Sequence, residues 1–287
     1  MPITPERTRF VFTKLERELV RLSSERQPES VHSFRTGTRR LQTLLEDLLP
    51  QRDRNHKKLL KMLTRIRKRA GKVRDLDVQL AALRSLKTPQ EPRRKTLLMQ
   101  SLIELRAEHD KKLRKVLDKE TVREIRKRLQ RASKELNLDS VRDPLATAKQ
   151  MLERAPRPQG SPSEELLHQY RILTKRARYT AEFAAKSPET DRFIVQLRRV
   201  QDALGDWHDW LMLTQNAASQ LGELPHSSLL AVLRNVTGSK SRRAVAVLAT
   251  SGSAKPALGS PGVAQEPGHQ KRNVKPSPAS LRATSAA

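Results

Sequence analysis

Apolar residues recur at intervals of three and four over most of the chain, from about residue 4 to residue 237. One such stripe comprises Val31, Phe34, Leu41, Leu45 and Leu48. This period is typical of amphipathic helices, and no segment shows the sustained alternation expected of a half-buried strand. The pattern therefore predicts an all-α protein without strands.

Prolines and polar segments divide this pattern into separate helices. Pro28 precedes the second helical segment and Pro50 follows it. Ser163 is expected to cap a later helix, because a serine hydroxyl accepts a hydrogen bond from the first helical turn. The pattern predicts helices over residues 4–23, 29–48, 54–86, 92–117, 119–136, 140–154, 163–186, 189–220 and 226–236.

The composition changes near residue 238. Residues 238–287 are rich in Gly, Ser, Ala and Pro and carry eight basic residues against one acidic residue. Such a segment buries too little apolar surface to offset the entropy lost on ordering, so we expect a low-complexity basic tail, disordered beyond about residue 250. Within it, only SRRAVAVLAT has the pattern of a short, weak helix.

Two helical segments carry the same basic motif. The first is SVHSFRTGTRRLQTLLEDLL, residues 30–49, and the second is LLHQYRILTKRARYTAEFAA, residues 166–185. At a constant offset of 136, His32, Arg35, Thr38, Arg39 and Arg40 correspond to His168, Arg171, Thr174, Lys175 and Arg176. A cluster of like charges costs energy unless an anion is expected there, so the repetition suggests a shared function.

A second pair of motifs lies downstream of the first, in RKRAGKVRDLDV (67–78) and QDALGDWHDWLM (201–212). At an offset of 134, Gly71, Arg74 and Asp75 correspond to Gly205, His208 and Asp209. The same order of motifs in both halves predicts a duplicated helical unit, with one repeat over about 4–136 and the other over about 140–237. A glycine inside a helix costs about 1 kcal/mol relative to alanine. A close helix crossing, a nearby anion or ordinary packing would each explain these two glycines.

The charge of the chain favours an anionic partner. The sequence has 58 basic and 31 acidic residues, a formal charge of +27. Such a charge attracts nucleic acid, anionic membranes or polyphosphate, although arginines on solvated faces alone would also produce it. The absence of cysteine excludes disulfides, thiolate zinc sites and cysteine nucleophiles. No apolar run suggests a signal peptide or a membrane span, so the expected location is the cytoplasm.

The two pairs of motifs resemble the CHAD domain, the conserved histidine α-helical domain, over residues 4–237. The resemblance implies two pseudo-symmetric helical bundles around a basic groove or pore, which bind inorganic polyphosphate, at polyphosphate granules in some members. Some members also carry a triphosphate-tunnel catalytic domain with an E-x-E-x-K strand, which this sequence lacks. Three features depart from the family: NVTGSKSRRAVAV looks eroded, Gln201 stands where the first half has Arg67, and the tail lies outside the resemblance.

The basic motifs supply the candidate phosphate ligands. Because helical residues advance by 100°, His32, Arg35 and Arg39 share one stripe, as do His168, Arg171, Lys175 and Arg178. Arginine donates two hydrogen bonds to phosphate, lysine supplies a point charge and histidine a donor whose charge follows the ligand. The expected phosphate-binding residues are His32, Arg35, Arg39, Arg40, Arg74, His168, Arg171, Lys175, Arg176 and Arg178. A second group, ranked lower, comprises Lys61, Arg65, Lys68 and His208.

Simpler structural roles compete with some of these interpretations. A lone helical histidine is more often a packing or hydrogen-bonding residue than a ligand contact. We expect Asp75 and Asp209 to pair with nearby cations and orient them rather than to hold a metal. Trp207 and Trp210 are expected to pack in the core rather than to stack on bases, and the mixed charges of residues 111–131 to form a solvated face.

Three functions fit the sequence to different degrees. Polyphosphate binding is the first expectation and nucleic-acid binding the alternative, with no cofactor expected and the oligomeric state left open. Only nine aromatic residues are present, which leaves few platforms for base stacking, and no helix-turn-helix or zinc-finger motif appears. An enzyme acting on phosphoanhydrides is not expected, because the sequence has neither G-x-x-x-x-G-K-[ST] nor H-E-x-x-H.

Overall fold

The computed structural model describes residues 3–87, 90–138, 140–156, 162–221 and 227–252, all of which belong to one compact unit, residues 1–253. The all-α prediction is confirmed: these residues form nine α-helices and one short π-helical segment, η1, and no strand. The elements are α1 (Pro5–Ser24), α2 (Pro28–Thr43), η1 (Leu44–Leu48), α3 (Arg54–Ser85), α4 (Pro92–Lys115), α5 (Lys119–Lys134), α6 (Pro144–Glu153), α7 (Glu164–Ala181), α8 (Pro188–Leu221) and α9 (Ser228–Gly252).

The helices begin at capping residues and prolines, as the sequence suggests. Ser163 caps α7, where its hydroxyl accepts a hydrogen bond from the Leu166 amide at 3.2 Å. Asp53 and Asp118 cap α3 and α5 through the same kind of hydrogen bond. Proline occupies the first turn of α1, α2, α4 and α6, where its missing amide proton costs nothing.

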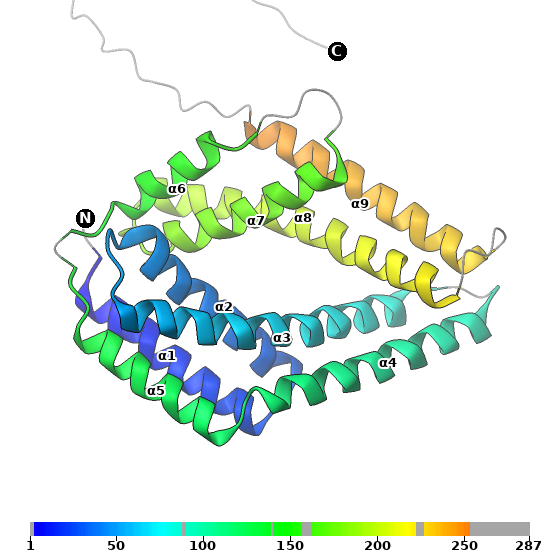
Figure 1. Ribbon diagram of the computed structural model, residues 1–287. Coiled ribbons are helices and arrows are strands. Elements are labelled where there is room, and N and C mark those ends of the chain that lie inside the picture. The colour runs from blue at the N-terminus through cyan, green and yellow to red at the C-terminus, as the bar shows by residue number, and fades with distance from the viewer. Residues whose placement is uncertain (1–2, 88–89, 139, 157–161, 222–226, 253–287) are drawn as a thin grey trace, which may run out of the picture. The chain divides into compact units, whose positions relative to one another are not determined.

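The helices pack in two groups (Figure 1). In the first, α1 packs on α2 and α5, and α2 packs on α3; in the second, α7 packs on α6 and α8, and α8 packs on α9. Contacts of α2 with α7 and of α3 with α8 join the two groups. Each half therefore contributes its histidine-bearing helix and its glycine-bearing helix to the junction.

Separate apolar clusters hold this arrangement together. The largest lies among α1, α2, η1, α3 and α5, where side chains such as Phe34 and Leu63 are fully buried. A second cluster joins the C-terminal parts of α3 and α8 to α4 and α9. The long helices α3 and α8 thus extend from the junction into this second cluster.

The last helix differs from the prediction. We expected a helix over 226–236 followed by an eroded segment, but α9 continues without interruption to Gly252. Ala244 and Val247 pack against Leu204 and Trp207 of α8, and this burial outweighs the unfavourable composition of the segment. The predicted disorder of the tail falls on residues 253–287, outside the described residues.

Candidate functional site: a cationic cluster at the junction

In the first half, α3 anchors the central arginine of α2. The Arg35 Nη1 atom donates to the Gly71 carbonyl oxygen at 3.2 Å and to the Asp75 carboxylate at 3.2 Å. Arg74, one turn from Gly71, interacts electrostatically with His32. The second motif therefore positions the first, with Asp75 orienting Arg35 as expected.

In the second half, α8 makes the corresponding contacts to α7. The Arg171 Nη2 atom lies 3.9 Å from the Asp209 Oδ1 atom, and the rings of His168 and His208 lie 5.2 Å apart between centroids. Both aspartates thus pair with the arginine three residues after the histidine, which confirms the pairing predicted for them. The duplication itself stays a prediction, which these matched contacts support.

The two sets of cations meet across the contact between α2 and α7. Lys175 on α7 interacts electrostatically with Arg35 and Arg39 on α2, and its charge also acts on His32. We call this group the central cluster: His32, Arg35, Arg39, Arg67, Arg74, His168, Arg171, Lys175 and His208.

Counter-charges are scarce in the central cluster. Within the part of the chain that the structure describes, Arg39, Arg67 and Lys175 make no hydrogen bond or ion pair, and the Nε atoms of Arg67 and Arg171 are buried without an acceptor. A buried donor without an acceptor costs about 1–3 kcal/mol. These side chains are therefore held in a destabilising arrangement that an anion would relieve.

Burial and mutual repulsion shift the pKa values of the cluster. Burial, with the charge of Arg171, lowers the pKa of Lys175 to about 7. Burial, with Arg39 and Arg35, lowers the pKa of Arg67 to about 10. Burial, with Arg171, His168 and Lys175, lowers the pKa of His208 to about 3. Near neutral pH, His208 is thus uncharged and Lys175 is only partly protonated.

Three further candidate ligands, besides Arg35 and Arg171, pair with acidic residues. The Arg40 Nε atom donates to the Glu182 Oε2 atom at 3.0 Å, and Arg178 also pairs with Glu182. The Arg176 Nε atom donates to the Asp47 Oδ2 atom at 2.9 Å. Phosphate binding by these three arginines stays a prediction, but each already has a carboxylate partner, which the unpartnered cations of the central cluster lack.

The lower-ranked lysines and arginine of α3 lie around a different feature. Lys61, Arg65 and Lys68 line a surface hollow of about 490 Å³ together with Arg52 and Glu46. Glu46 lies 3.6 Å from Arg52 in this hollow, so its charge is already partly matched. Lys61, Arg65 and Lys68 therefore form a basic patch outside the central cluster, and their predicted contact with phosphate stays a prediction.

Arg67 belongs to the central cluster, although the sequence analysis did not select it. Matching the two halves drew attention to positions that are alike, whereas Arg67 corresponds to Gln201. The available signal was its spacing, since Arg67 lies one turn before Gly71 and two turns before Asp75 on the same face of α3.

The two helix-interior glycines are not explained by a close helix crossing. A Cβ atom on Gly205 would meet nothing within 4 Å, and one on Gly71 would meet only the Arg35 guanidinium at 3.8 Å. Gly205 thus faces open space, whereas a Cβ on Gly71 would make an ordinary van der Waals contact with Arg35, so packing requires a glycine at neither position.

The tryptophans take the structural role expected of them. Trp207 is fully buried against α9, and Trp210 is partly buried against the cluster between α8 and α4. Among the described residues, no three His, Cys, Asp or Glu side chains are arranged to hold a metal ion, and no helix is long and apolar enough to cross a membrane.

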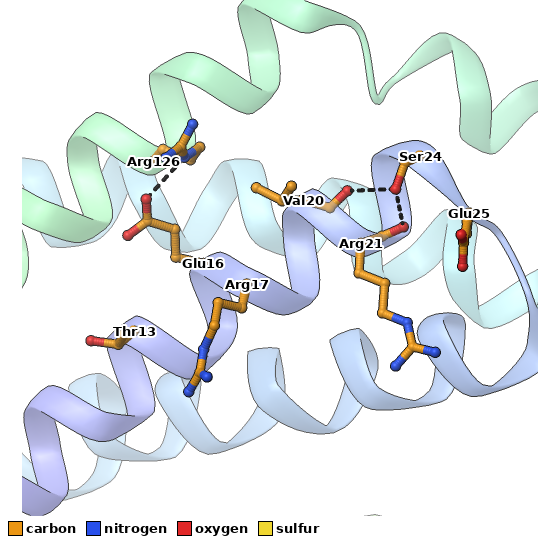
Figure 2. A pocket seen from close by; sticks show the side chains of 8 residues that line it. All are labelled: Thr13, Glu16, Arg17, Val20, Arg21, Ser24, Glu25 and Arg126. Atoms are coloured by element: carbon orange, nitrogen blue, oxygen red, sulfur yellow. Dashed lines mark hydrogen bonds and ion pairs between the residues drawn. The ribbon is translucent and has the colours of Figure 1, made fainter.

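A second arginine-rich feature lies away from the junction, on α1 and α5. We call it the outer hollow: a cavity of about 630 Å³ lined by Thr13, Glu16, Arg17, Val20, Arg21, Ser24, Glu25 and Arg126 (Figure 2). The Arg126 Nε atom lies 2.9 Å from the Glu16 carboxylate, whereas Arg17 and Arg21 extend from α1 on the side away from Arg126.

An all-helical protein with a cationic cluster where two helical groups meet is the class that this geometry defines. The CHAD domain family model matches residues 9–218, and the chain belongs to this family. The fold is similar to the crystal structure of the CHAD domain from the plant Ricinus communis, with a TM-score of 0.56, 20% identity and coverage of 85% of this chain and 89% of that one. It is also similar to PptA from Streptomyces chartreusis, with a TM-score of 0.61, 18% identity and coverage of 86% and 95%. No curated protein matches the sequence.

Proposed function

We propose that the protein binds inorganic polyphosphate at the central cluster. The CHAD family is associated with polyphosphate binding. The observation that carries the proposal is the convergence of Arg39, Arg67 and Lys175, cations from both halves that feel the charges of Glu46 or Asp209 but make no direct ion pair or hydrogen bond among the described residues. A long anion with a charge on every phosphate supplies what these side chains lack.

The accessibility of the cluster supports the same proposal. The side chains of His32 and Arg39 are exposed, yet burial by surrounding protein lowers the pKa of both. A phosphate group in solution can therefore reach both side chains.

Polyphosphate is favoured over nucleic acid because the tyrosine and the tryptophan that lie beside the cluster among the described residues are not available for stacking on a base. The aromatic residues beside it, Tyr179 and Trp207, are buried, and the Arg178 guanidinium covers the Tyr179 ring at 4.4 Å. Binding of single strands usually depends on exposed aromatic faces as well as on phosphate contacts. Apart from its histidine rings, the cluster presents only cationic side chains that donate to phosphate.

A titration of polyphosphate into matched variants tests the proposal. We expect a variant with Arg35, Arg39, Arg171 and Lys175 changed to alanine to lose nearly all binding. The control changes Arg93, Lys115, Arg123 and Lys127 to alanine; these residues are exposed on α4 and α5, and the net charge falls equally. Circular dichroism checks that both variants are folded. Equal losses in the two variants would overturn the proposal, because they would show binding through net charge alone.

Competition separates the two kinds of polyanion. We expect RNA or DNA of equal phosphate content to displace polyphosphate poorly at matched salt, because it adds bases that the cluster does not contact. Efficient displacement would favour the nucleic-acid alternative.

We propose binding without turnover, and association with polyphosphate granules in the cell. Incubation of the protein with polyphosphate and Mg²⁺ or Mn²⁺ should release no orthophosphate. A fluorescent fusion should gather at granules stained for polyphosphate, and the variant with four alanines in the central cluster should not. Steady release of orthophosphate, or a diffuse wild-type fusion, would contradict the respective part.

A further inference from the structure

At one pair of matched positions, the two halves carry an arginine and a glutamine in opposite order. At the offsets that match the halves, Gln42 on α2 corresponds to Arg178 on α7, and Arg67 on α3 corresponds to Gln201 on α8. Each half therefore has one arginine and one glutamine at these two positions, on opposite helices.

In the second half, the arginine and the glutamine are hydrogen-bonded to each other. The Arg178 Nε atom donates to the Gln201 Oε1 atom at 2.7 Å, and Arg178 also pairs with Glu182 one turn further along α7. The guanidinium is buried, and both its charge and its Nε–H group are matched within the protein.

In the first half, the corresponding glutamine and arginine are not hydrogen-bonded to each other. The Gln42 Nε2 atom donates to the Glu46 carboxylate at 2.8 Å, but the Gln42 Oε1 atom and the Arg67 Nε atom are both buried without a partner. Glu46, whose charge acts on Arg39 and Arg67, is also engaged by Arg52 at 3.6 Å. Two neighbouring guanidiniums, Arg39 and Arg67, therefore share the distant charge of Glu46 and make no direct hydrogen bond or ion pair among the described residues.

We propose, on the basis of the polyphosphate-binding function, that Arg39 and Arg67 form a subsite for the doubly charged terminal phosphoryl group of a linear polyphosphate chain. An internal phosphate carries one negative charge and two unbridged oxygens. A terminal phosphoryl group carries about −1.5 to −2 charges near pH 7 and has three such oxygens. Two planar guanidinium forks match the terminal group better in both charge and number of donors.

The equivalent place in the second half lacks this capacity. Lys175 stands where the first half has Arg39, and Gln201 where it has Arg67. Arg178, the arginine that contacts Gln201, already has its partners. The two ends of the central cluster therefore differ. A chain bound across it places its terminal phosphoryl group at Arg67 and its internal phosphates toward Lys175 and Arg171.

A comparison of free and blocked chain ends tests this subsite. The probes are linear polyphosphate of one short, defined length and the same length with both terminal phosphoryl groups esterified, each titrated at about pH 8, where the free terminal group is doubly charged. We expect the wild type to bind the free-ended chain about ten-fold more tightly, the effect of one further charge-assisted contact.

The variant Arg67→Gln installs the residue found at position 201 and should abolish most of this preference. The control Arg69→Gln removes the same charge from an exposed position on the same helix and should keep it. A wild type without preference, or an Arg67→Gln variant that retains it, would overturn the subsite. If the wild type binds neither probe nor long-chain polyphosphate, the proposed function fails instead, so the two failures are distinguishable.

Discussion

The central cluster and the outer hollow are both rich in arginine, but they differ in the acidic residues beside the arginines. The outer hollow contains Glu16 and Glu25, and its Arg126 is paired with Glu16. In the central cluster the two aspartates each pair with one arginine, which leaves Arg39, Arg67 and Lys175 without a direct ion pair or hydrogen bond among the described residues.

This difference in nearby acidic residues distinguishes two environments of arginine. An exposed arginine near a carboxylate costs little, because water and the carboxylate both compensate its charge. A crowded cation without a carboxylate destabilises the folded protein until an anion binds. We therefore take cations that lack a direct ion pair as a better guide to the proposed binding site than the number of basic residues.

The largest expected difference between the two regions is in polyphosphate affinity. Changing Arg39 and Lys175 together to alanine should weaken binding about 100-fold, since each removes a charge-assisted contact worth roughly ten-fold. Changing Arg17 and Arg21 of the outer hollow to alanine should weaken it by no more than about two-fold, through net charge alone. Titration with polyphosphate at one fixed salt concentration measures the affinity of both variants. Similar losses of affinity would show that the two regions do not differ in binding.

The pH dependence of binding should come from the central cluster. Lys175, with a pKa of about 7 in the free protein, loses its proton as the pH rises above 7, and a bound anion restores it. Binding then takes up a proton, so affinity should fall above pH 7, by up to about ten-fold per pH unit. The variant Lys175→Arg, which stays charged, should flatten this dependence. Calorimetry in buffers with different ionisation enthalpies detects the proton directly, and no uptake above pH 7 would refute the assignment.

The stability of the free protein should show the cost of the same charge. Below pH 7 Lys175 is protonated in both the folded and the unfolded state, so the penalty of its burial is fully present. Lys175→Met should therefore raise the free energy of unfolding by about 1 kcal/mol at pH 6. The gain should shrink as the pH rises from about 7 toward the ordinary lysine pKa of about 10.4, where the unfolded chain also loses the proton. Chemical denaturation at several pH values measures this, and a loss of stability at pH 6 would contradict it.

The smallest effect is expected in the outer hollow. Arg126→Gln removes the ion pair between Arg126 and Glu16, in which the Arg126 side chain is 49% exposed. Exposed pairs contribute about 0.2–1 kcal/mol, so unfolding should change by less than about 1 kcal/mol and polyphosphate affinity hardly at all. Glu16→Gln is the partner control, and a large effect of either change on affinity would make the hollow part of the site.

The sequence predicted most of the helical framework because helices follow from local signals. Apolar periodicity, prolines and capping residues such as Ser163 located the helices to within a few residues. The end of α9 was missed because its stability comes from the contacts of Ala244 and Val247 with α8, which composition does not reveal.

The motif positions could be predicted, but the partners of individual arginines could not. Matching the two halves identified Asp75 and Asp209, and the predicted pairing of each with a nearby cation is confirmed. It did not separate Arg39 from Arg40, which differ by 100° around α2, because the helix to which each would turn is a property of the tertiary packing. Arg67 was missed since its importance arises from the absence of a partner, which only the structure reveals.

The pairs of Arg40 with Glu182 and of Arg176 with Asp47 fasten each histidine-bearing helix to the segment that ends the other one. These reciprocal attractions hold together two surfaces that repel one another at Arg39 and Lys175. Salt weakens attraction and repulsion alike, so we expect the fold to tolerate a wide range of ionic strength, whereas the proposed binding of a polyanion should weaken steeply as salt is added. The ion pairs that hold the two halves together are thus separate from the proposed binding residues, so the ligand could leave without unfolding the protein.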